Sequence, residues 1–316
     1  MSTNSTRHSN LQCFLGSITP SVTTQSLPQL CVRNLSSAWY PLGKEDVDYF
    51  TLGDLWDRYY EWSAYGAGVP ILFHTGQTVV QYYVPYLSSI QIYTTKSLAA
   101  MRALGEDSES DCWSDDSESE KLSRSWDATS EDSSFDQDGS WPTSRLGYLY
   151  FQYMECCPPW GRIPFMDKVT ELSRSYPGLM SFKSTDLSPA SWMSVAWYPI
   201  YHIPACKSTK DLSASFLTFH TISSSFQDDS ITDLVEKEMP CESTANSNRK
   251  SSKDTIKRIS LPPFGLATYK MQGNLWLNPE SSDYEKIMTL YSSADSWLKQ
   301  LRFHHHDFNF FITHAM

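Results

Sequence analysis

The chain has 316 residues, of which 40% are hydrophobic and 14% aromatic, and it carries 36 acidic and 25 basic residues. No apolar run reaches the roughly 18 residues that a membrane-spanning helix needs, and the first residues lack the basic start of a secretory signal. Seven cysteines without a Cys-x-x-Cys pair favour free, mostly buried thiols in a reducing compartment.

The first well-specified element is a helix that begins after Thr51. Thr51 and Asp54 have the spacing of a capping box, in which each side chain can accept the other's backbone N–H. Apolar residues then recur at helical spacing, and Gly66 is suited to end the helix.

Two aromatic segments follow. Residues 79–93 are β-branched and aromatic on both faces, which predicts a strand covered on both sides, with Pro85 at a bulge or an edge. Residues 96–104 fit a short helix. Residues 146–154 fit a strand or a buried helix, because periodicity does not separate the two.

Between these segments lies an acidic, serine-rich insert, residues 106–139. It contains thirteen carboxylates and two basic residues, so the rest of the chain is neutral, with 23 of each sign. Such a composition predicts a disordered loop. Four residues in it precede an acid by three positions, as acid-directed kinases prefer, and are candidate phosphorylation sites. These are Ser108, Ser117, Thr129 and Ser133.

The second half of the chain predicts further helices and strands. We expect a short helix over residues 165–176, and a long helix that opens on a second capping box formed by Ser282 and Glu285. The remaining segments have strand character: 192–203 and 212–222 as an antiparallel hairpin, then 264–277, and finally 307–313.

This mixed order favours an α+β fold, with one domain built on a mixed, largely antiparallel sheet and flanking helices. We expect a flexible start over residues 1–25, and the acidic insert and a polar insert over 224–258 to be disordered. The globular domain is then discontinuous, made of 26–105, 140–223 and 259–316.

Several stretches are similar to a plant family known as domain of unknown function 789. They are NLQCFLGSITPSV (10–22), LGDLWDRYYEWSAYGAGVP (52–70), VVQYYVPYLSSIQIY (79–93), YPGL (176–179), DLSPASWMSVAWYPIYHIP (186–204) and DFNFF (307–311). The resemblance spans most of the chain outside the two inserts. It implies a plant origin and supplies no catalytic residues.

The histidines do not form a convincing metal or catalytic site. His304 and His306 would share one face of a strand, yet three histidines beyond a helix end are better explained as a solvated turn. His202 and His220 lie on the two strands of the predicted hairpin. If residue 203 pairs near 213, His220 lies opposite Ala196, far from His202 along the sheet.

Nucleic-acid binding fits poorly with a neutral folded part and an acidic insert. The basic cluster at residues 249–258 lies in the second insert, where solvation is the more common meaning and a nuclear import signal fits as well as a nucleic-acid contact. No cofactor motif is present, because Walker A, Gly-x-Ser-x-Gly and His-Glu-x-x-His patterns are all missing.

We therefore expect an interaction module in the cytoplasm or nucleus, with a plastid as the alternative, that binds basic protein partners and is controlled by an acid-directed kinase. Exposed members of an aromatic set would form its binding groove, and buried members would be core. The set is Tyr82, Tyr83, Tyr86, Trp197, Tyr198 and Tyr201. The alternatives are an undetected enzyme using Asp48, Glu61, His74 and Asp167, and a transcription-associated nuclear protein.

Overall fold

A computed structural model describes residues 8–28, 46–94, 146–200, 212–224 and 257–314. These residues form a mixed α+β fold around a six-stranded antiparallel sheet, which confirms the predicted fold class. The strand order is β10-β8-β7-β5-β4, and β6 also pairs with β5. The bounds are β4 Ala67–Leu72, β5 Thr78–Thr94, β6 Tyr148–Met154, β7 Trp192–Pro199, β8 Ser215–Thr221 and β10 Gly265–Tyr269.

The long strand β5 organises the sheet. Along one edge it pairs first with β4, up to Tyr83, and later with β6, from Ser89 onward; along the other edge it pairs with β7. Pro85 lies in the short part of β5 that pairs with neither β4 nor β6, and on its other side it lies opposite Trp197 of β7. Proline has no N–H to donate, so a strand tolerates it where one side has no neighbouring strand, as predicted.

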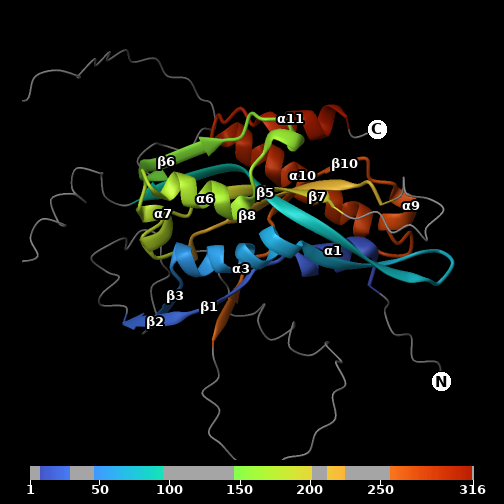
Figure 1. Ribbon diagram of the computed structural model, residues 1–316, viewed down its shortest axis with the longest axis horizontal. Coiled ribbons are helices and arrows are strands. Elements are labelled where there is room, and N and C mark those ends of the chain that lie inside the picture. Colours follow the sequence, from blue (N-terminus) through green and yellow to red (C-terminus); the bar gives the residue numbers. More distant parts are fainter. Residues whose placement is uncertain (1–7, 29–45, 95–145, 201–211, 225–256, 315–316) are drawn as a thin grey trace, which may run out of the picture.

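Helices cover both faces of the sheet (Figure 1). One face carries α1 (Asn10–Ser17), α3 (Leu52–Tyr65), α6 (Phe165–Ser173), α7 (Gly178–Ser181) and α9 (Gly273–Trp276). The other face carries α10 (Asp283–Gln300) and α11 (His306–Thr313), which contact β10 and β8. Helices therefore lie on both sides of the sheet, as the composition of β5 predicted, although Tyr82 of β5 stays partly exposed.

Helix α3 forms where the sequence placed it. The Thr51 hydroxyl accepts the Asp54 N–H at 3.2 Å, and the Asp54 carboxylate accepts the Thr51 N–H at 2.9 Å, so the capping box is complete. Gly66 ends the helix at a φ of 80°, a conformation that glycine adopts without strain. Trp56 is fully buried, and its indole N–H donates to the Leu179 carbonyl of α7.

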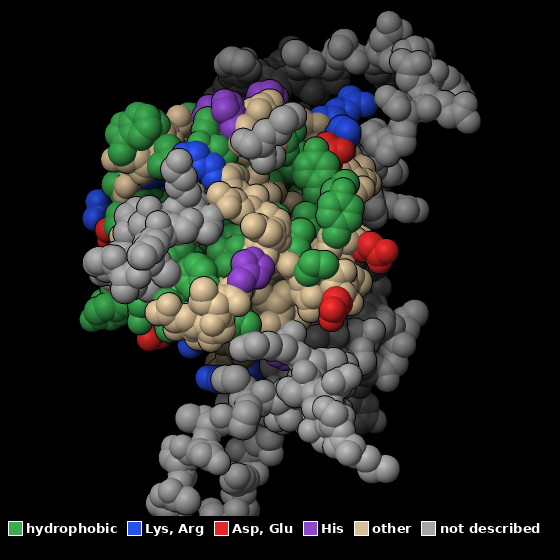
Figure 2. Space-filling view, turned by 90° about the vertical axis from the view of Figure 1, so that its right-hand side faces the viewer, with side chains coloured by type: hydrophobic (Ala, Val, Ile, Leu, Met, Phe, Trp, Pro, Cys, Tyr) green, Lys and Arg blue, Asp and Glu red, His purple; other side chains and the backbone are tan. Residues whose placement is uncertain are grey.

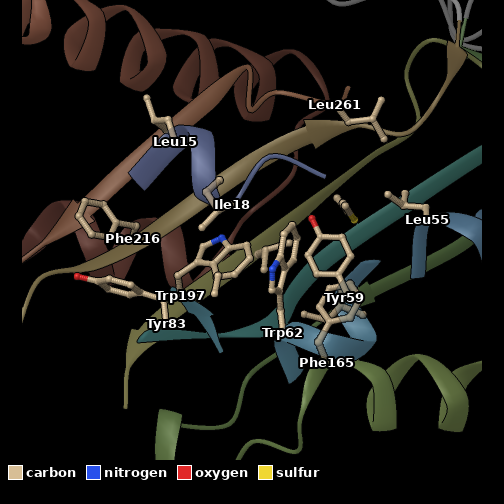
Figure 3. Close-up of a cluster of buried hydrophobic side chains, with 14 of the residues drawn as sticks. Leu15, Ile18, Leu55, Tyr59, Trp62, Tyr83, Phe165, Trp197, Phe216 and Leu261 are labelled. Carbon is tan, nitrogen blue, oxygen red and sulfur yellow. The ribbon is translucent and has the colours of Figure 1, made fainter. Parts of the chain in front are cut away.

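The first face contains most of the hydrophobic core. Figure 3 shows Tyr59 and Trp62 of α3 packed with Trp197 of β7 and Phe165 of α6, and Tyr83 beside Phe216. The rings of Tyr59 and Phe165 stack at 4.3 Å between centroids. Burial of this many aromatic side chains is the main stabilising contribution of the fold.

Residues 10–17 form helix α1 within the segment 1–25 that was expected to be flexible, which corrects that expectation for this helix. Ser9 and Gln12 form a capping box at the start of α1, and Phe14 is completely buried against the core. The Asn10 amide joins three elements: its Nδ2 donates to the Leu72 and Leu275 carbonyls and its Oδ1 accepts the Leu72 N–H, all at 2.8 Å. These long-range hydrogen bonds hold α1 against β4 and α9.

The C-terminal helices bring two further corrections. Residues 307–313, predicted as a strand, form α11, because Phe308 and Phe311 are spaced to share one buried helix face. Ser282 precedes α10 but its side chain makes no capping hydrogen bond; instead the Asp283 carboxylate accepts the Asn278 N–H at 2.9 Å.

The predicted hairpin forms with a different register. Strands β7 and β8 pair antiparallel, but His220 lies opposite Met193, three residues from the expected Ala196. The predicted strand over residues 264–277 is only partly right, since β10 ends at Tyr269 and the short helix α9 follows. Residues 146–154 were compatible with either a strand or a buried helix, and they contain strand β6.

Two small antiparallel ribbons lie outside the main sheet. Strand β1 (Ser21–Thr23) pairs with β9 (Arg258–Ser260), and β2 (Gln25–Pro28) pairs with β3 (Asp46–Tyr49). The expected helix over residues 96–104, the whole acidic insert and residues 225–256 of the polar insert lie outside the described residues.

The cysteines correct one expectation. Within the described residues, Cys13, Cys156 and Cys157 are free thiols, but Cys13 is only half-buried and the adjacent pair is exposed. The expectation of buried thiols is therefore wrong for Cys156 and Cys157.

Candidate functional site

Strand alternation divides the predicted aromatic set into two faces of the sheet. Tyr83 and Trp197 point into the core of the first face and are completely buried. Tyr82, Tyr86 and Tyr198 point to the opposite face, where Tyr82 is 37% exposed and the other two are half-buried. We call these three residues the tyrosine row. Tyr201 lies outside the described residues.

The tyrosine row is built on paired strands. Tyr198 lies opposite Val84, two residues along β5 from Tyr86, and the Tyr86 and Tyr198 rings are 5.9 Å apart between centroids. Tyr198 also lies 6.4 Å from the Phe311 ring of α11. Burial is the main cause that raises the Tyr198 pKa above its ordinary value, so its hydroxyl stays protonated at neutral pH.

A buried ion pair lies beneath this row. Arg162, which precedes α6, forms a bidentate pair with Asp307 in the first turn of α11: Nη2 donates to Oδ1 at 2.6 Å and Nη1 to Oδ2 at 2.7 Å. The Ser88 hydroxyl donates to the same carboxylate at 2.5 Å. The guanidinium carbon lies 5.9 Å from the Tyr198 ring centre, a cation–π contact. Asp307 thus joins Arg162 to Ser88 of β5, and Arg162 in turn contacts Tyr198 of the tyrosine row.

The charges of this pair are fixed by their surroundings. Burial alone would raise the pKa of Asp307, but the hydrogen bonds and charge of Arg162 outweigh it and hold that pKa below its usual range. Because the Asp307 carboxylate lies at the N-terminus of α11, the helix dipole also favours its negative charge. The pair therefore remains ionised and does not supply a proton donor or acceptor near neutral pH.

The connection between β6 and α6 is pinned at both ends. The Glu155 carboxylate accepts the backbone N–H groups of Cys156 at 3.0 Å and Cys157 at 2.8 Å, and the Tyr153 hydroxyl at 2.8 Å. At the other end, Arg162 Nε donates to the Cys157 carbonyl at 2.8 Å. Within this connection lies the 3-10 turn η1, Pro159–Gly161.

Ser194 and His305 resemble part of a hydrolytic triad beside Asp307, but their hydrogen bonds run in the wrong direction. His305 Nδ1 accepts the Phe308 N–H at 3.0 Å, which caps α11. A neutral ring then carries its proton on Nε2, which lies 2.8 Å from the Ser194 hydroxyl and donates to it. A general base needs a free nitrogen facing the nucleophile, so this histidine cannot activate Ser194.

His305 is also shielded from solvent, which corrects its assignment to a solvated turn. Burial lowers its pKa to about 3, so the ring is neutral at physiological pH. Only His304 and His306 of the triplet are exposed. They flank the start of a helix instead of sharing a strand face, and no group of three His, Cys, Asp or Glu residues in the described part of the chain could hold a metal ion.

His220 belongs to a separate buried hydrogen-bond chain. The Trp197 indole N–H donates to the Thr218 hydroxyl at 3.0 Å, which lies 2.9 Å from His220 Nε2, and His220 Nδ1 lies 2.9 Å from the Leu261 carbonyl. The carbonyl can only accept, so Nδ1 carries the proton. Its proposed companion His202 lies outside the described residues.

The four residues proposed for an undetected enzyme do not converge. Asp48 is on β3, Glu61 on α3, His74 in the β4–β5 turn and Asp167 on α6. Hydrogen bonds and ion pairs of the described residues join no two of these four; Asp48 instead contacts Ser26 and Lys257. The candidate phosphorylation sites Ser108, Ser117, Thr129 and Ser133 lie outside the described residues.

Sequence reasoning missed Arg162, Asp307, Ser88 and His305 as a cluster. Arg162 and Asp307 are 145 positions apart, and Ser88 is 219 positions from Asp307, so no local spacing reveals their contact. The one available signal was composition: a single charged residue in each of two largely apolar segments, GRIPF and DFNFF, where an unpaired charge would be costly to bury.

A family model described as "Protein of unknown function (DUF789)" matches residues 9–311. The chain belongs to this family. The DUF789 match begins at the capping residue of α1 and ends at Phe311 of α11, so it includes both ends of the sheet-covering structure and the Arg162–Asp307 pair. Comparison with curated proteins finds no match, and neither does comparison with solved structures.

No helix among the described residues combines the length and the apolar composition that crossing a bilayer requires.

Proposed function

We propose that this chain is a non-catalytic protein-interaction module, acting in the cytoplasm or nucleus, that binds a basic segment of another protein. The observation behind this proposal is the tyrosine row, three tyrosines on one sheet face, of which Tyr198 contacts the buried Arg162. Tyrosine is enriched at binding hot spots because it combines a large apolar area with a polar tip and few rotatable bonds.

Electrostatics favours a basic partner. Lysine and arginine side chains bind aromatic faces through cation–π contacts, and Tyr198 already makes one with Arg162. Outside the acidic insert the chain has 23 acidic and 23 basic residues, and Figure 2 shows side chains of both signs scattered over the viewed end of the molecule. The net charge of −11 equals that of the acidic insert, which would attract the same partner through solvent.

Phosphorylation would then tune the attraction. Each phosphate adds roughly 1.5 to 2 negative charges at neutral pH, so modification of Ser108, Ser117, Thr129 and Ser133 by an acid-directed kinase would strengthen binding to a basic partner. The same charges would weaken binding to an acidic partner. An enzyme, or a transcription-associated role, has no specific observation among the described contacts that favours it.

A direct test uses a synthetic arginine- and lysine-rich peptide as the probe. Its dissociation constant would be measured by calorimetry for the unmodified chain, for a variant with Ser108, Ser117, Thr129 and Ser133 changed to Glu, and for Tyr82→Ala/Tyr86→Ala. We expect the Glu variant to bind more tightly and the tyrosine variant more weakly. Affinity should fall as salt shortens the screening length below about 8 Å.

The matched controls are the same four sites changed to Ala and an aromatic removed elsewhere, Tyr284→Ala on the exposed side of α10. Equal affinities and equal salt dependence for every version would remove both the tyrosine row and the regulatory role of the insert. A catalytic activity that the Tyr82→Ala/Tyr86→Ala variant retains would instead indicate that the protein is an enzyme.

A further inference from the structure

Trp160 is the most exposed large hydrophobic side chain among the described residues, with 88% of its surface accessible. It lies in the turn η1 between β6 and α6, and its indole makes no ring contact with another described aromatic residue. Tryptophan has the largest apolar side chain and is highly buried on average in folded proteins, so an indole this exposed is unusual. Its meaning depends on how the turn presents it.

The turn that presents Trp160 is held rigidly. Pro158 and Pro159 fix two backbone angles immediately before it. Glu155 accepts two backbone N–H groups at the start of the connection, and Arg162 holds its end through the Cys157 carbonyl and the Asp307 carboxylate. A tryptophan on a preorganised turn loses little conformational entropy on binding, which is the property of a hot-spot residue.

The charges near the turn favour a protein pocket over a lipid surface. Membrane-binding loops combine aromatic residues with exposed cations that attract anionic lipid. Between Cys156 and Ile163 the only cation is Arg162, whose side chain is 2% exposed and already paired with Asp307. Lys168, on the following helix, lies over the Tyr153 ring and pairs with Glu171.

We propose that Trp160 is the anchor of a protein-binding surface, inserted into an apolar pocket of a partner protein. The inference rests on the proposed interaction function and names a second contact beside the tyrosine row. Arg162 connects the two, because the residue that holds the Trp160 turn also lies against Tyr198. A partner that covers both would bury Trp160 in its pocket and place basic groups over the tyrosines.

The test begins with a cDNA display library of protein fragments selected on the full chain. Each recovered fragment would be sequenced and purified, and its dissociation constant measured against the unmodified chain, Trp160→Ala, Trp160→Phe and Tyr284→Ala. We expect Trp160→Ala to weaken binding roughly 30-fold or more, as at binding hot spots, and Trp160→Phe to weaken it less. Tyr284→Ala removes an exposed aromatic on α10 and should leave affinity unchanged.

Thermal unfolding of each variant provides the folding control, because an exposed side chain should leave the midpoint unchanged. Fragments that tolerate Trp160→Ala within about twofold but require Tyr82 and Tyr86 would overturn the Trp160 proposal and leave the interaction function standing. The absence of any fragment that requires Trp160 would overturn it as well. So would Trp160-dependent binding to vesicles of phosphatidylcholine and phosphatidylserine, or Trp160-dependent dimerisation in sedimentation.

Discussion

Arg162 and Asp307 form a bidentate ion pair with side chains that are 2% and 3% exposed, and they join the β6–α6 connection to the last helix of the fold. Two charges taken out of water in this way are stable only because each has its partner. Loss of either partner should therefore lower the stability of the fold, and Arg162 also contacts Tyr198 of the tyrosine row.

The first prediction concerns this pair. Removing either partner, by Arg162→Ala or Asp307→Ala, should lower the free energy of unfolding by about 3–5 kcal/mol, because the remaining charge is buried without a partner. The double variant Arg162→Met/Asp307→Leu should recover most of that loss. Denaturant titrations would measure all three.

The control for the pair is Lys299→Ala, which breaks the exposed pair with Asp295 on α10. That change should barely move the unfolding midpoint, since surface pairs contribute little. Losses that simply add in the double Arg162/Asp307 variant would show that the two side chains act independently.

A second prediction concerns hydroxyls in the core. The Tyr83 hydroxyl is buried and finds no hydrogen-bond partner among the described residues, whereas the Tyr150 hydroxyl accepts the Gly178 N–H at 3.0 Å. Tyr83→Phe should leave stability unchanged or raise it by up to about 1 kcal/mol, because it removes an unpaired polar group. Tyr150→Phe should cost about 1 kcal/mol.

Chemical denaturation of the two variants side by side would check this contrast. Equal losses of stability from both changes would mean that the Tyr83 hydroxyl has a partner of its own.

Helix α3 was predictable and α11 was not, for a physical reason. The start of α3 is encoded within four residues, because Thr51 and Asp54 satisfy each other's backbone groups. Helix α11 is capped by His305, a less usual capping residue, and its aromatic run fits a strand equally well when read alone. What selects the helix is packing of Phe308 and Phe311 against β8 and β10, which local sequence does not contain.

The candidate site, too, was predictable only in part. The sequence contained the aromatic set, but the face that each ring occupies depends on strand alternation across β5 and β7, whose register was misplaced for the β7–β8 pair. The Arg162–Asp307 pair depends on contacts between distant segments. Local patterns thus specified the elements, while the arrangement of the site depended on tertiary packing.

A third prediction concerns pH and His220. Burial lowers the pKa of His220 from 6.5 to about 4, so between these values the unfolded chain binds a proton that the folded chain does not. Stability is therefore fully present above pH 6.5 and falls as the pH drops toward 4. The loss from this one group would be on the order of 3 kcal/mol.

Unfolding free energies of the unmodified chain and of His220→Gln, measured from pH 7.5 to 4, would test this. The variant should be less stable at pH 7.5, because it disturbs the Thr218 and Leu261 contacts, but its stability should fall less steeply with acid. His74→Gln, at an exposed turn position, should reproduce the slope of the unmodified chain. An unchanged slope in His220→Gln would contradict the buried neutral assignment.

The last prediction concerns the acidic insert. Strand β5 ends at Thr94 and β6 begins at Tyr148, and these two residues are paired neighbours in the sheet. The intervening chain therefore leaves and returns at adjacent points, so shortening it requires no change in the sheet. Deleting residues 106–139 retains residues 95–105 and 140–147 as the connection and leaves 23 acidic and 23 basic residues.

We expect this deletion to change the melting temperature by less than about 5 °C, because the removed segment is too polar to contribute to a core. A larger drop, on the order of 1–2 kcal/mol or more, would mean that the insert packs against the domain. Binding of the basic peptide should lose most of its salt dependence, since the charge responsible has been removed. A variant with the insert sequence shuffled would keep both the stability and the salt dependence if charge alone is what matters.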